Sequence, residues 1–334
     1  MKGVLVLPGT GSAQFAANLI DRPFLRHTVD SMANRGLRDI RIVGPASAVS
    51  QARDLLRLGY QWDASMGYCE ADSPAQYELL AIAGNTEQCL IASASCLPGL
   101  RPAVDPETHS GSIIYGTSGE WTGWALINAE DIASLPRLCH EPEVLSHLQS
   151  LPNYAGIAAD AEFRCCTAEQ IWQAHHDAQE SNFSGLSHAG IETKPGVWIA
   201  RNASVAGSAE ITPPVYIGEN SRIGPETKIG PFAVIAKDCL IAARTTVRHA
   251  VVAPGTYAGD NLELDHVLVD KSRLFDLRFG VSIDGVDGPM LDGVFDFHWP
   301  AITERVQAAV ASCAAGLSSR LSRIRRDPET DTRV

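Results

Sequence analysis

Residues 199–252 read IARNAS VAGSAE ITPPVY IGENSR IGPETK IGPFAV IAKDCL IAARTT VRHAVV, with a branched aliphatic residue opening every group of six. The column runs without a gap from Ile199 to Val247, and the next position is small in most groups, as at Gly218 and Gly224. A period of six fits neither an α-helix nor simple strand alternation. It is typical of a prism-shaped solenoid, in which each hexad forms one short strand with its aliphatic side chain pointing inward.

These regular columns of aliphatic and small residues resemble the hexapeptide repeat family. The resemblance implies a left-handed parallel β-helix with three hexads per coil, so the hexads from Ile199 to Val252 would form three coils. The register slips after Val252, and we expect residues 253–270 to form about one further, imperfect coil. Such coils serve acyltransferases and also passive assembly domains, so the repeat alone does not fix a function.

The first half of the chain has a different pattern. An apolar strand, KGVLVL, precedes a turn at residues 8–12 that contains Gly9 and Gly11. Leu25, Val29 and Met32 then follow at helical spacing, and the apolar run at 40–43 is typical of a buried strand. This β-loop-α-β order predicts a Rossmann-like α/β nucleotide-binding domain.

Composition excludes several classes of protein. The 334 residues, 45% hydrophobic and 20% charged, indicate a soluble globular chain of about two domains. The net charge of −12 disfavours nucleic-acid binding, because a phosphate backbone would meet no attractive field. No two of the eight cysteines form a C-x-x-C pair, which favours buried, reduced thiols in a cytoplasmic protein.

The order of elements in the first half, with RPFLRHTVDSMANRGLRDIRIV, resembles the sugar-1-phosphate nucleotidyltransferases, which often carry a C-terminal hexapeptide β-helix. The resemblance continues through residues 89–100 and 122–136. The DRPF stretch at 21–24 and the late VVAPGTYAGDNLELDHVLVD are similar to the branch found in bacterial exopolysaccharide gene clusters.

Catalytic positions implied by this resemblance are altered. Residues 8–13 match the family's Gly-rich loop but carry Ala13 in place of its arginine, and the signature lysine that follows has no room. Ser95 stands where the resemblance places a metal-binding aspartate, and residues 72–76 lack the glycines of the base-binding segment. A hydroxyl cannot replace a carboxylate in holding Mg²⁺. We therefore expect no metal site and no catalysis, with Mg²⁺ as cofactor only if the chain is active.

The nucleotide-binding residues predicted from the resemblance are Gly9, Thr10, Gly11, Ser12 and Ser95. The leading hypothesis is a non-catalytic sugar-nucleotide-binding or scaffolding subunit of surface polysaccharide synthesis, with a sugar nucleotide or sugar phosphate as ligand. The first alternative is an active nucleotidyltransferase whose charged groups come from other positions.

Histidines raise a second alternative, a β-helix acyltransferase, because such enzymes use a histidine base. His249 and His266 are the candidates, but no loop interrupts the hexads to build a cleft, so surface positions are expected. His175 and His176 lie in a predicted helix, where one of two neighbours would face solvent.

The C-terminal stretch predicts an amphipathic helix with a net charge of +4 between residues 303 and 326. Its apolar stripe is Ile302, Val306, Val310, Cys313, Leu317, Leu321 and Ile324. This helix could pack on its own protein or on another subunit, or dock on the inner membrane or a membrane-associated polysaccharide synthesis protein. A homo-oligomer is expected, because solenoid flanks expose strand surfaces.

The expected segments are a nucleotidyltransferase-like domain (1–165), a helical linker (166–196), the hexapeptide β-helix (197–272), an extended tail (273–300), the basic helix (301–326) and a disordered tail (327–334).

Overall fold

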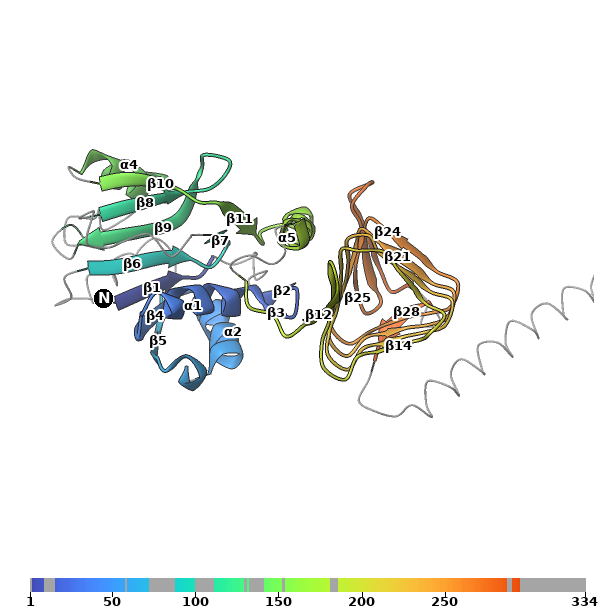
Figure 1. The fold of residues 1–334 in the computed structure, drawn as a ribbon. Helices are drawn as coiled ribbons and strands as arrows, with labels where there is room; N and C mark the ends of the chain where they lie inside the picture. Colours follow the sequence, from blue (N-terminus) through green and yellow to red (C-terminus); the bar gives the residue numbers. More distant parts are fainter. Residues whose placement is uncertain are drawn as a thin grey trace, which may run out of the picture.

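A computed structural model gives the fold of residues 2–8, 16–57, 59–71, 88–99, 111–128, 131, 141–151, 154–180, 186–286 and 290–294. An α/β domain and a β-helix lie side by side, with one helix between them (Figure 1). The predicted fold class is confirmed for both domains. The predicted C-terminal helix at 301–326 and the tail after it lie outside the described residues.

The N-terminal domain is built on a seven-stranded sheet in the order β10-β8-β9-β6-β1-β4-β5. Strands β5, β4, β1 and β6 are parallel to one another, and β9 runs antiparallel to both β6 and β8. The strand bounds are β1 Lys2–Val6, β4 Asp39–Gly44, β5 Ser65–Glu70, β6 Gln88–Ser93, β8 Gly111–Tyr115, β9 Trp121–Asn128 and β10 Tyr154–Ala158.

Helices cover both faces of this sheet. Helix α1 (Phe24–Asn34) buries Leu25, Val29 and Met32, the residues whose helical spacing predicted it. Helix α2 (Ala46–Leu56) joins the same core cluster, whereas α4 (Glu141–Ser150) packs on the opposite face through Val144 and Leu148. Two small antiparallel pairs complete the domain: β2 (Asn18–Leu19) with β3 (Arg22–Pro23), and β7 (Cys96–Gly99) with β11 (Ala161–Arg164).

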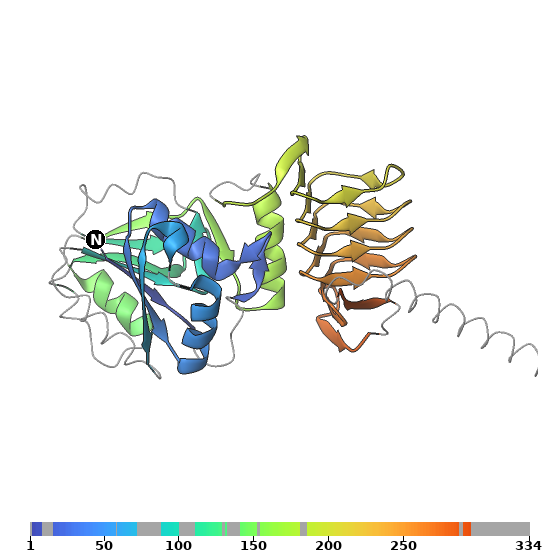
Figure 2. The ribbon, with the colours of Figure 1, turned by 90° about the horizontal axis from the view of Figure 1, so that it is seen from below.

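The β-helix has three parallel sheets, one for each side of the prism, and its coils stack along one axis (Figure 2). The strands of the first side are β13 Val197–Ile199, β16 Val215–Ile217, β19 Ala233–Ile235, β22 Ala250–Val252 and β25 Val267–Asp270. Those of the second are β14 Ser204–Val205, β17 Arg222–Ile223, β20 Leu240–Ile241 and β23 Thr256–Ala258, and those of the third are β15 Glu210–Ile211, β18 Lys228–Ile229, β21 Thr246–Arg248 and β24 Glu263–Asp265.

The predicted aliphatic column fills the interior of this prism. Ile217, Ile235 and Ile241 have no exposed surface, and Ile229 keeps 1%. The small residues that follow them allow neighbouring coils to approach. A Cβ added at Gly218 would lie 2.5 Å from the carbonyl carbon of Ala236 in the next coil. The hexad rule therefore describes both the core and the spacing of the coils.

Coil length changes partway along the solenoid. Val197 pairs with Val215 and Val215 with Ala233, at equal steps along the chain, but the next step, from Ala233 to its partner Ala250, is shorter by one position. The third side of that coil has therefore lost a position. The register slip lies before Ala250, at His249, and not after Val252 as the sequence suggested.

Both ends of the solenoid pair with additional strands. At the first coil, β12 (Ile191–Lys194) runs antiparallel to β13. At the last, the hairpin of β26 (Arg273–Asp276) and β27 (Val281–Asp284) extends the sheet from β25, and β28 (Leu291–Gly293) pairs with β23. Within the segment expected as an extended tail over 273–300, these strands are paired, and their backbone satisfies the open strand edges of the final coil.

Helix α5 (Ala168–Glu180) joins the two domains. Its Ala174 and Ala178 belong to one core cluster with Tyr216 and Val234 of the β-helix. Across the described segments, no helix combines the length and the apolar character needed to cross a bilayer.

Candidate functional site

The end of β6 is the first candidate site, because the family resemblance implies a metal-binding aspartate there and this chain has Ser95 instead. Ser95 lies in the turn between β6 and β7. Its N–H donates to Ser93 Oγ at 3.2 Å, and its carbonyl accepts the N–H of Cys165 at 3.2 Å. The Ala94 N–H donates to the Val6 carbonyl at 2.9 Å, which ties this turn to the end of β1. The turn is fixed by the backbone.

Ser93 and Cys165, the described residues that form hydrogen bonds with Ser95, are uncharged. Burial raises the pKa of the Cys165 thiol, so it stays protonated at neutral pH. The fully buried Trp124 donates its indole N–H to the Cys96 carbonyl at 2.7 Å. Cys89, Cys96, Cys165 and Cys239 are buried free thiols, as the sequence predicted, whereas Cys166 is exposed.

A group of charges that the sequence did not predict lies on β11, the strand that pairs with β7, and in the β8–β9 turn. Arg164, on β11, forms ion pairs with Glu162 and, at 3.5 Å, with Glu120 in the β8–β9 turn. Glu162 also accepts a hydrogen bond from Ser118. Glu120 and Ser118 are far from β11 in sequence, so no local sequence pattern could predict these contacts. Both carboxylates contact the single guanidinium of Arg164, so the group carries one negative charge in excess.

Mg²⁺ does not fit the described part of this turn. Magnesium is held by carboxylates with octahedral oxygen geometry, and Ser93, Ala94 and Ser95 supply none. Gly9, Thr10, Gly11 and Ser12, together with Ala13 and residues 72–76, lie outside the described residues, so their predicted roles stay predictions.

The second candidate site is a corner of the β-helix, which we call the histidine corner and define as Phe232, Arg248, His249, Asp265 and His266. Its three ring residues end successive coils on the third side, and all three have positive φ angles, of 52°, 45° and 55° for Phe232, His249 and His266. Their rings form a column: Phe232 and His249 lie 5.3 Å apart and His249 and His266 lie 4.7 Å apart, with near-parallel planes. Both histidines lie partly exposed at the surface, as expected, and the shortened coils align their rings.

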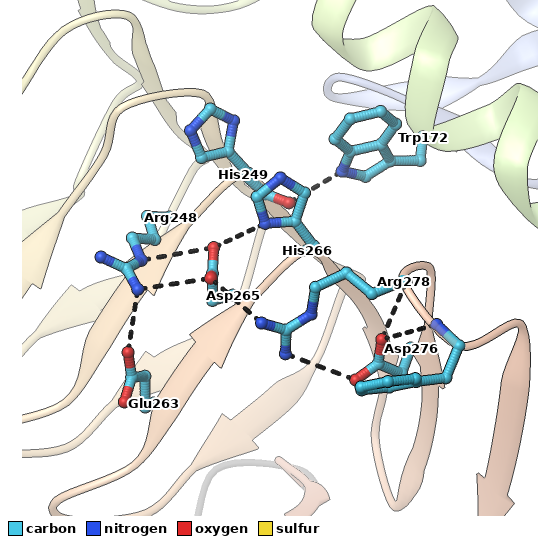
Figure 3. Close-up of polar contacts among 9 residues, drawn as sticks. Trp172, Arg248, His249, Glu263, Asp265, His266, Asp276 and Arg278 are labelled. Carbon is cyan, nitrogen blue, oxygen red and sulfur yellow. Dashed lines mark hydrogen bonds and ion pairs between the residues drawn. The ribbon is translucent and has the colours of Figure 1, made fainter.

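Asp265 organises the charges at this corner (Figure 3). Only 9% exposed, it lies 2.8 Å from His266 Nδ1, 3.3 Å from Arg248 and 3.4 Å from Arg278 of the neighbouring hairpin. Burial alone would raise the pKa of this carboxyl, but the hydrogen bond from His266 and the charges beside it hold the pKa below its usual value. Asp265 therefore stays ionised.

The His266 imidazole is oriented by that contact. With Nδ1 donating to the carboxylate, Nε2 keeps its lone pair and can accept a proton. His249, stacked on it, has a lowered pKa through burial and the neighbouring His266. The arrangement is a carboxylate-oriented base beside a neutral imidazole.

Helix α5 closes one side of the corner. Its Trp172 donates an indole N–H to the His249 carbonyl at 2.8 Å, and the Trp172 and His266 rings lie 6.0 Å apart (Figure 3). The groups that contact this corner from outside the hexads thus come from α5 and the β26–β27 hairpin.

Neither histidine of the His175-His176 pair simply faces solvent, so that expectation is wrong. His175 is buried, accepts the Ile20 N–H at Nδ1 and contacts the Asn18 carbonyl through Nε2 at 2.9 Å. Burial lowers the pKa of His175 to about 4. His176 stacks on Phe232 at 3.9 Å. The two side chains contact different domains.

Comparisons with known proteins agree with this architecture. Residues 214–249 match the family described as bacterial transferase hexapeptide (six repeats). A curated UTP–glucose-1-phosphate uridylyltransferase from Synechocystis is 32% identical over 157 residues, which cover 40% of this chain and 40% of that protein. The chain thus spans about two fifths of the length of this relative.

A crystal structure of a proposed glucose-1-phosphate thymidylyltransferase from Bacillus anthracis, in complex with a sucrose, superposes with a TM-score of 0.46. It is 12% identical, and the match covers 56% of this chain and 96% of that one. This likeness is distant, and the fold rests on the strand pairings described above.

Fold and repeats together define an α/β domain joined to a hexapeptide β-helix. The chain resembles the sugar-1-phosphate nucleotidyltransferases with hexapeptide repeats, as its sequence predicted.

Proposed function

We propose that this protein is a sugar-nucleotidyltransferase-like subunit of bacterial surface or exopolysaccharide biosynthesis that binds a sugar nucleotide or acts as a scaffold without catalysing nucleotidyl transfer. The observation that supports this proposal most directly is the structure of the turn after β6. Where the family resemblance implies a metal-binding carboxylate, Ser95 is held by backbone contacts to Ser93 and to the neutral Cys165.

Nucleotidyl transfer needs negative ligands for a metal ion and cations on the phosphates. At the described turn, the oxygen side chains are hydroxyls, and the guanidinium of Arg164 is already paired with Glu120 and Glu162. Uncharged polar groups and N–H donors can still contact a ligand, but they supply little stabilisation to the charge that develops on the transferred phosphate.

Three further parts of the proposal follow from the sequence. The protein works in the cytoplasm and attaches at the inner membrane through the basic stretch 301–326. It assembles as a homo-oligomer through its solenoid. Its partner is a membrane-associated protein of polysaccharide synthesis, and nucleic acid is not a ligand.

The decisive test is pyrophosphate release by the purified chain from a panel of NTPs and hexose-1-phosphates with Mg²⁺, beside calorimetric titration with the corresponding sugar nucleotides. We expect no turnover above a protein-free blank. Turnover that is lost in Ser12→Ala or Ser95→Ala would contradict the proposal and establish the active nucleotidyltransferase instead.

Acyl transfer is a second candidate function, favoured by one observation, the 2.8 Å contact between Asp265 Oδ1 and His266 Nδ1. In this reaction His266 Nε2 would take the proton of an acceptor amine or hydroxyl as that atom attacks a thioester carbonyl. The C–S bond then breaks, and the leaving thiolate takes a proton.

Release of free CoA from acetyl-CoA, measured with amino- and hydroxyl-bearing sugar nucleotides, tests this candidate. Acyl transfer requires turnover that falls at least 100-fold in His266→Ala and is unchanged in His147→Ala on α4. Equal rates in the two variants, or no acceptor-dependent release, would exclude it.

A further inference from the structure

We infer that the last turn of α5 forms a divalent transition-metal site of the zinc class, with His176, Asp177 and Glu180 as its ligands. The site is independent of the proposed function, and it lies on the helix that joins the domains. The ligand atoms of the three side chains all lie within 4.8 Å of one another.

The separations suit an ion between the groups. His176 Nδ1 lies 3.7 Å from Glu180 Oε1, which is too long for a hydrogen bond. A zinc ion with Zn–N and Zn–O bonds of about 2.1 Å in tetrahedral geometry places its ligand atoms about 3.4 Å apart. A small rotation of the Glu180 carboxylate closes the difference, because that side chain is 58% exposed.

The imidazole is held in place before any ion binds. Its ring stacks on Phe232 with centroids 3.9 Å apart and planes 12° from parallel, and Trp172 lies 5.5 Å away on the same helix. Nδ1 itself is buried and has no hydrogen-bond partner. A buried, unpaired ring nitrogen costs free energy that a metal bond would remove, and the stacked ring loses little rotational freedom on binding.

The Asp177 carboxylate is also held in place by a neighbouring side chain. Asp177 Oδ1 accepts a hydrogen bond from Gln173 Nε2 at 2.6 Å, one helical turn earlier. Such outer contacts fix the direction of a ligating carboxylate. The Asp265 carboxylate at the histidine corner is different, because its oxygens already contact His266, Arg248 and Arg278.

Ligand chemistry selects the kind of ion. One imidazole nitrogen with two carboxylates suits Zn²⁺, with water in the open position, whereas Mg²⁺ and Ca²⁺ prefer oxygen ligands alone. An ion here would fix the end of α5 directly before the segment that leads to β12.

Calorimetric titration of the chelator-treated full chain with ZnCl₂, in the presence of a competing chelator, tests the site. We expect one saturable equivalent that weakens at least tenfold in Glu180→Gln and in His176→Gln. Two matched control variants should bind zinc as tightly as the wild type. Glu169→Gln removes the same charge from the exposed first turn of α5, and His147→Gln removes an imidazole from α4.

Cysteines could bind zinc elsewhere, so Co²⁺ provides the second measurement. The inferred site predicts visible d–d bands without a thiolate-to-cobalt charge-transfer band, and these bands disappear in Glu180→Gln. Equal zinc affinity in all four variants and the wild type, or a cobalt spectrum carried only by thiolate bands, would overturn the assignment. Far-UV circular dichroism of Glu180→Gln checks that the exposed substitution leaves the fold intact.

Discussion

The turn after β6 and the histidine corner are built in opposite ways. At the turn, the backbone of Ser95 makes the contacts, and the nearby large side chain, Trp124, is buried with its indole N–H bonded to a carbonyl. At the corner, side chains make the contacts, and Asp265 contacts groups from three sequence segments.

The comparison shows that the packed turn and the side chains with reactive groups lie in different domains of the molecule. The place that the family resemblance associates with chemistry is a neutral, packed turn. The oriented imidazole lies instead on the β-helix, at the corner where the coils are shortened. The following predictions test whether the turn acts through packing and the corner through charge, in order of decreasing effect.

Replacing Trp124 with alanine should have the largest effect, lowering the free energy of unfolding of the N-terminal domain by about 3–5 kcal/mol. The substitution removes a side chain with no exposed surface and leaves the Cys96 carbonyl without its donor. Urea denaturation followed by near-UV circular dichroism measures the loss. Tyr60→Ala, at a side chain that is 85% exposed, is the control and should change stability by less than about 0.5 kcal/mol.

His175→Gln should change the pH dependence of stability. The unfolded chain binds a proton at this imidazole below about pH 6.5, whereas the folded chain does so only near pH 4. Stability therefore falls as pH drops through this window, and the wild type should lose about 3 kcal/mol more than the variant between pH 7 and pH 4. Parallel curves for the two proteins would contradict the buried neutral imidazole.

Asp265→Asn should destabilise the β-helix by about 1–2 kcal/mol at pH 7, because it removes a charged acceptor from His266 and two guanidinium groups. The folded-state pKa of Asp265 lies below its ordinary value of 3.8. Its contribution is therefore present above about pH 4 and disappears as pH falls through the folded-state pKa.

Denaturation midpoints of the wild type and Asp265→Asn at pH 7 and pH 3 measure that difference. If the difference between the two midpoints is equally large at both pH values, the shape of the Asp265 side chain, and not its charge, accounts for that difference.

Ser95→Ala should have the smallest effect, within about 0.5 kcal/mol, because the contacts of Ser95 use its backbone N–H and carbonyl. Ser93→Ala should cost more, about 1 kcal/mol, because Ser93 Oγ accepts the Ser95 N–H. Thermal unfolding of both variants gives the comparison. A larger loss in Ser95→Ala would show that its hydroxyl has a role beyond the backbone contacts.

The interior of the β-helix was predictable because one residue in six must point inward, and Ile217, Ile229 and Ile241 do so. The start of the α/β domain was predictable for a similar reason, since α1 buries the residues at helical spacing. In both regions a local period decides which side chains are buried.

The histidine corner could not be predicted by the same reasoning. His249 and His266 lie on successive coils and meet only because each ends a side that has lost a position. That shortening interrupts the six-residue column, so the histidines occupy the positions where the periodic signal ends. The contacts of Asp265 with Arg278, and of Trp172 with the His249 carbonyl, depend on how a hairpin and a distant helix pack against the prism.

Helix α5 has a practical consequence for dissecting the protein. His175 contacts the β2 segment of the first domain, whereas Trp172 and Gln179 donate hydrogen bonds to carbonyls of the β-helix. Cutting the gene on either side of this helix would leave one half with an exposed apolar face and unpaired backbone groups. We therefore expect each domain to depend on α5 for part of its stability, and a chimaera that gives the β-helix a new N-terminal partner would have to recreate both faces of this helix.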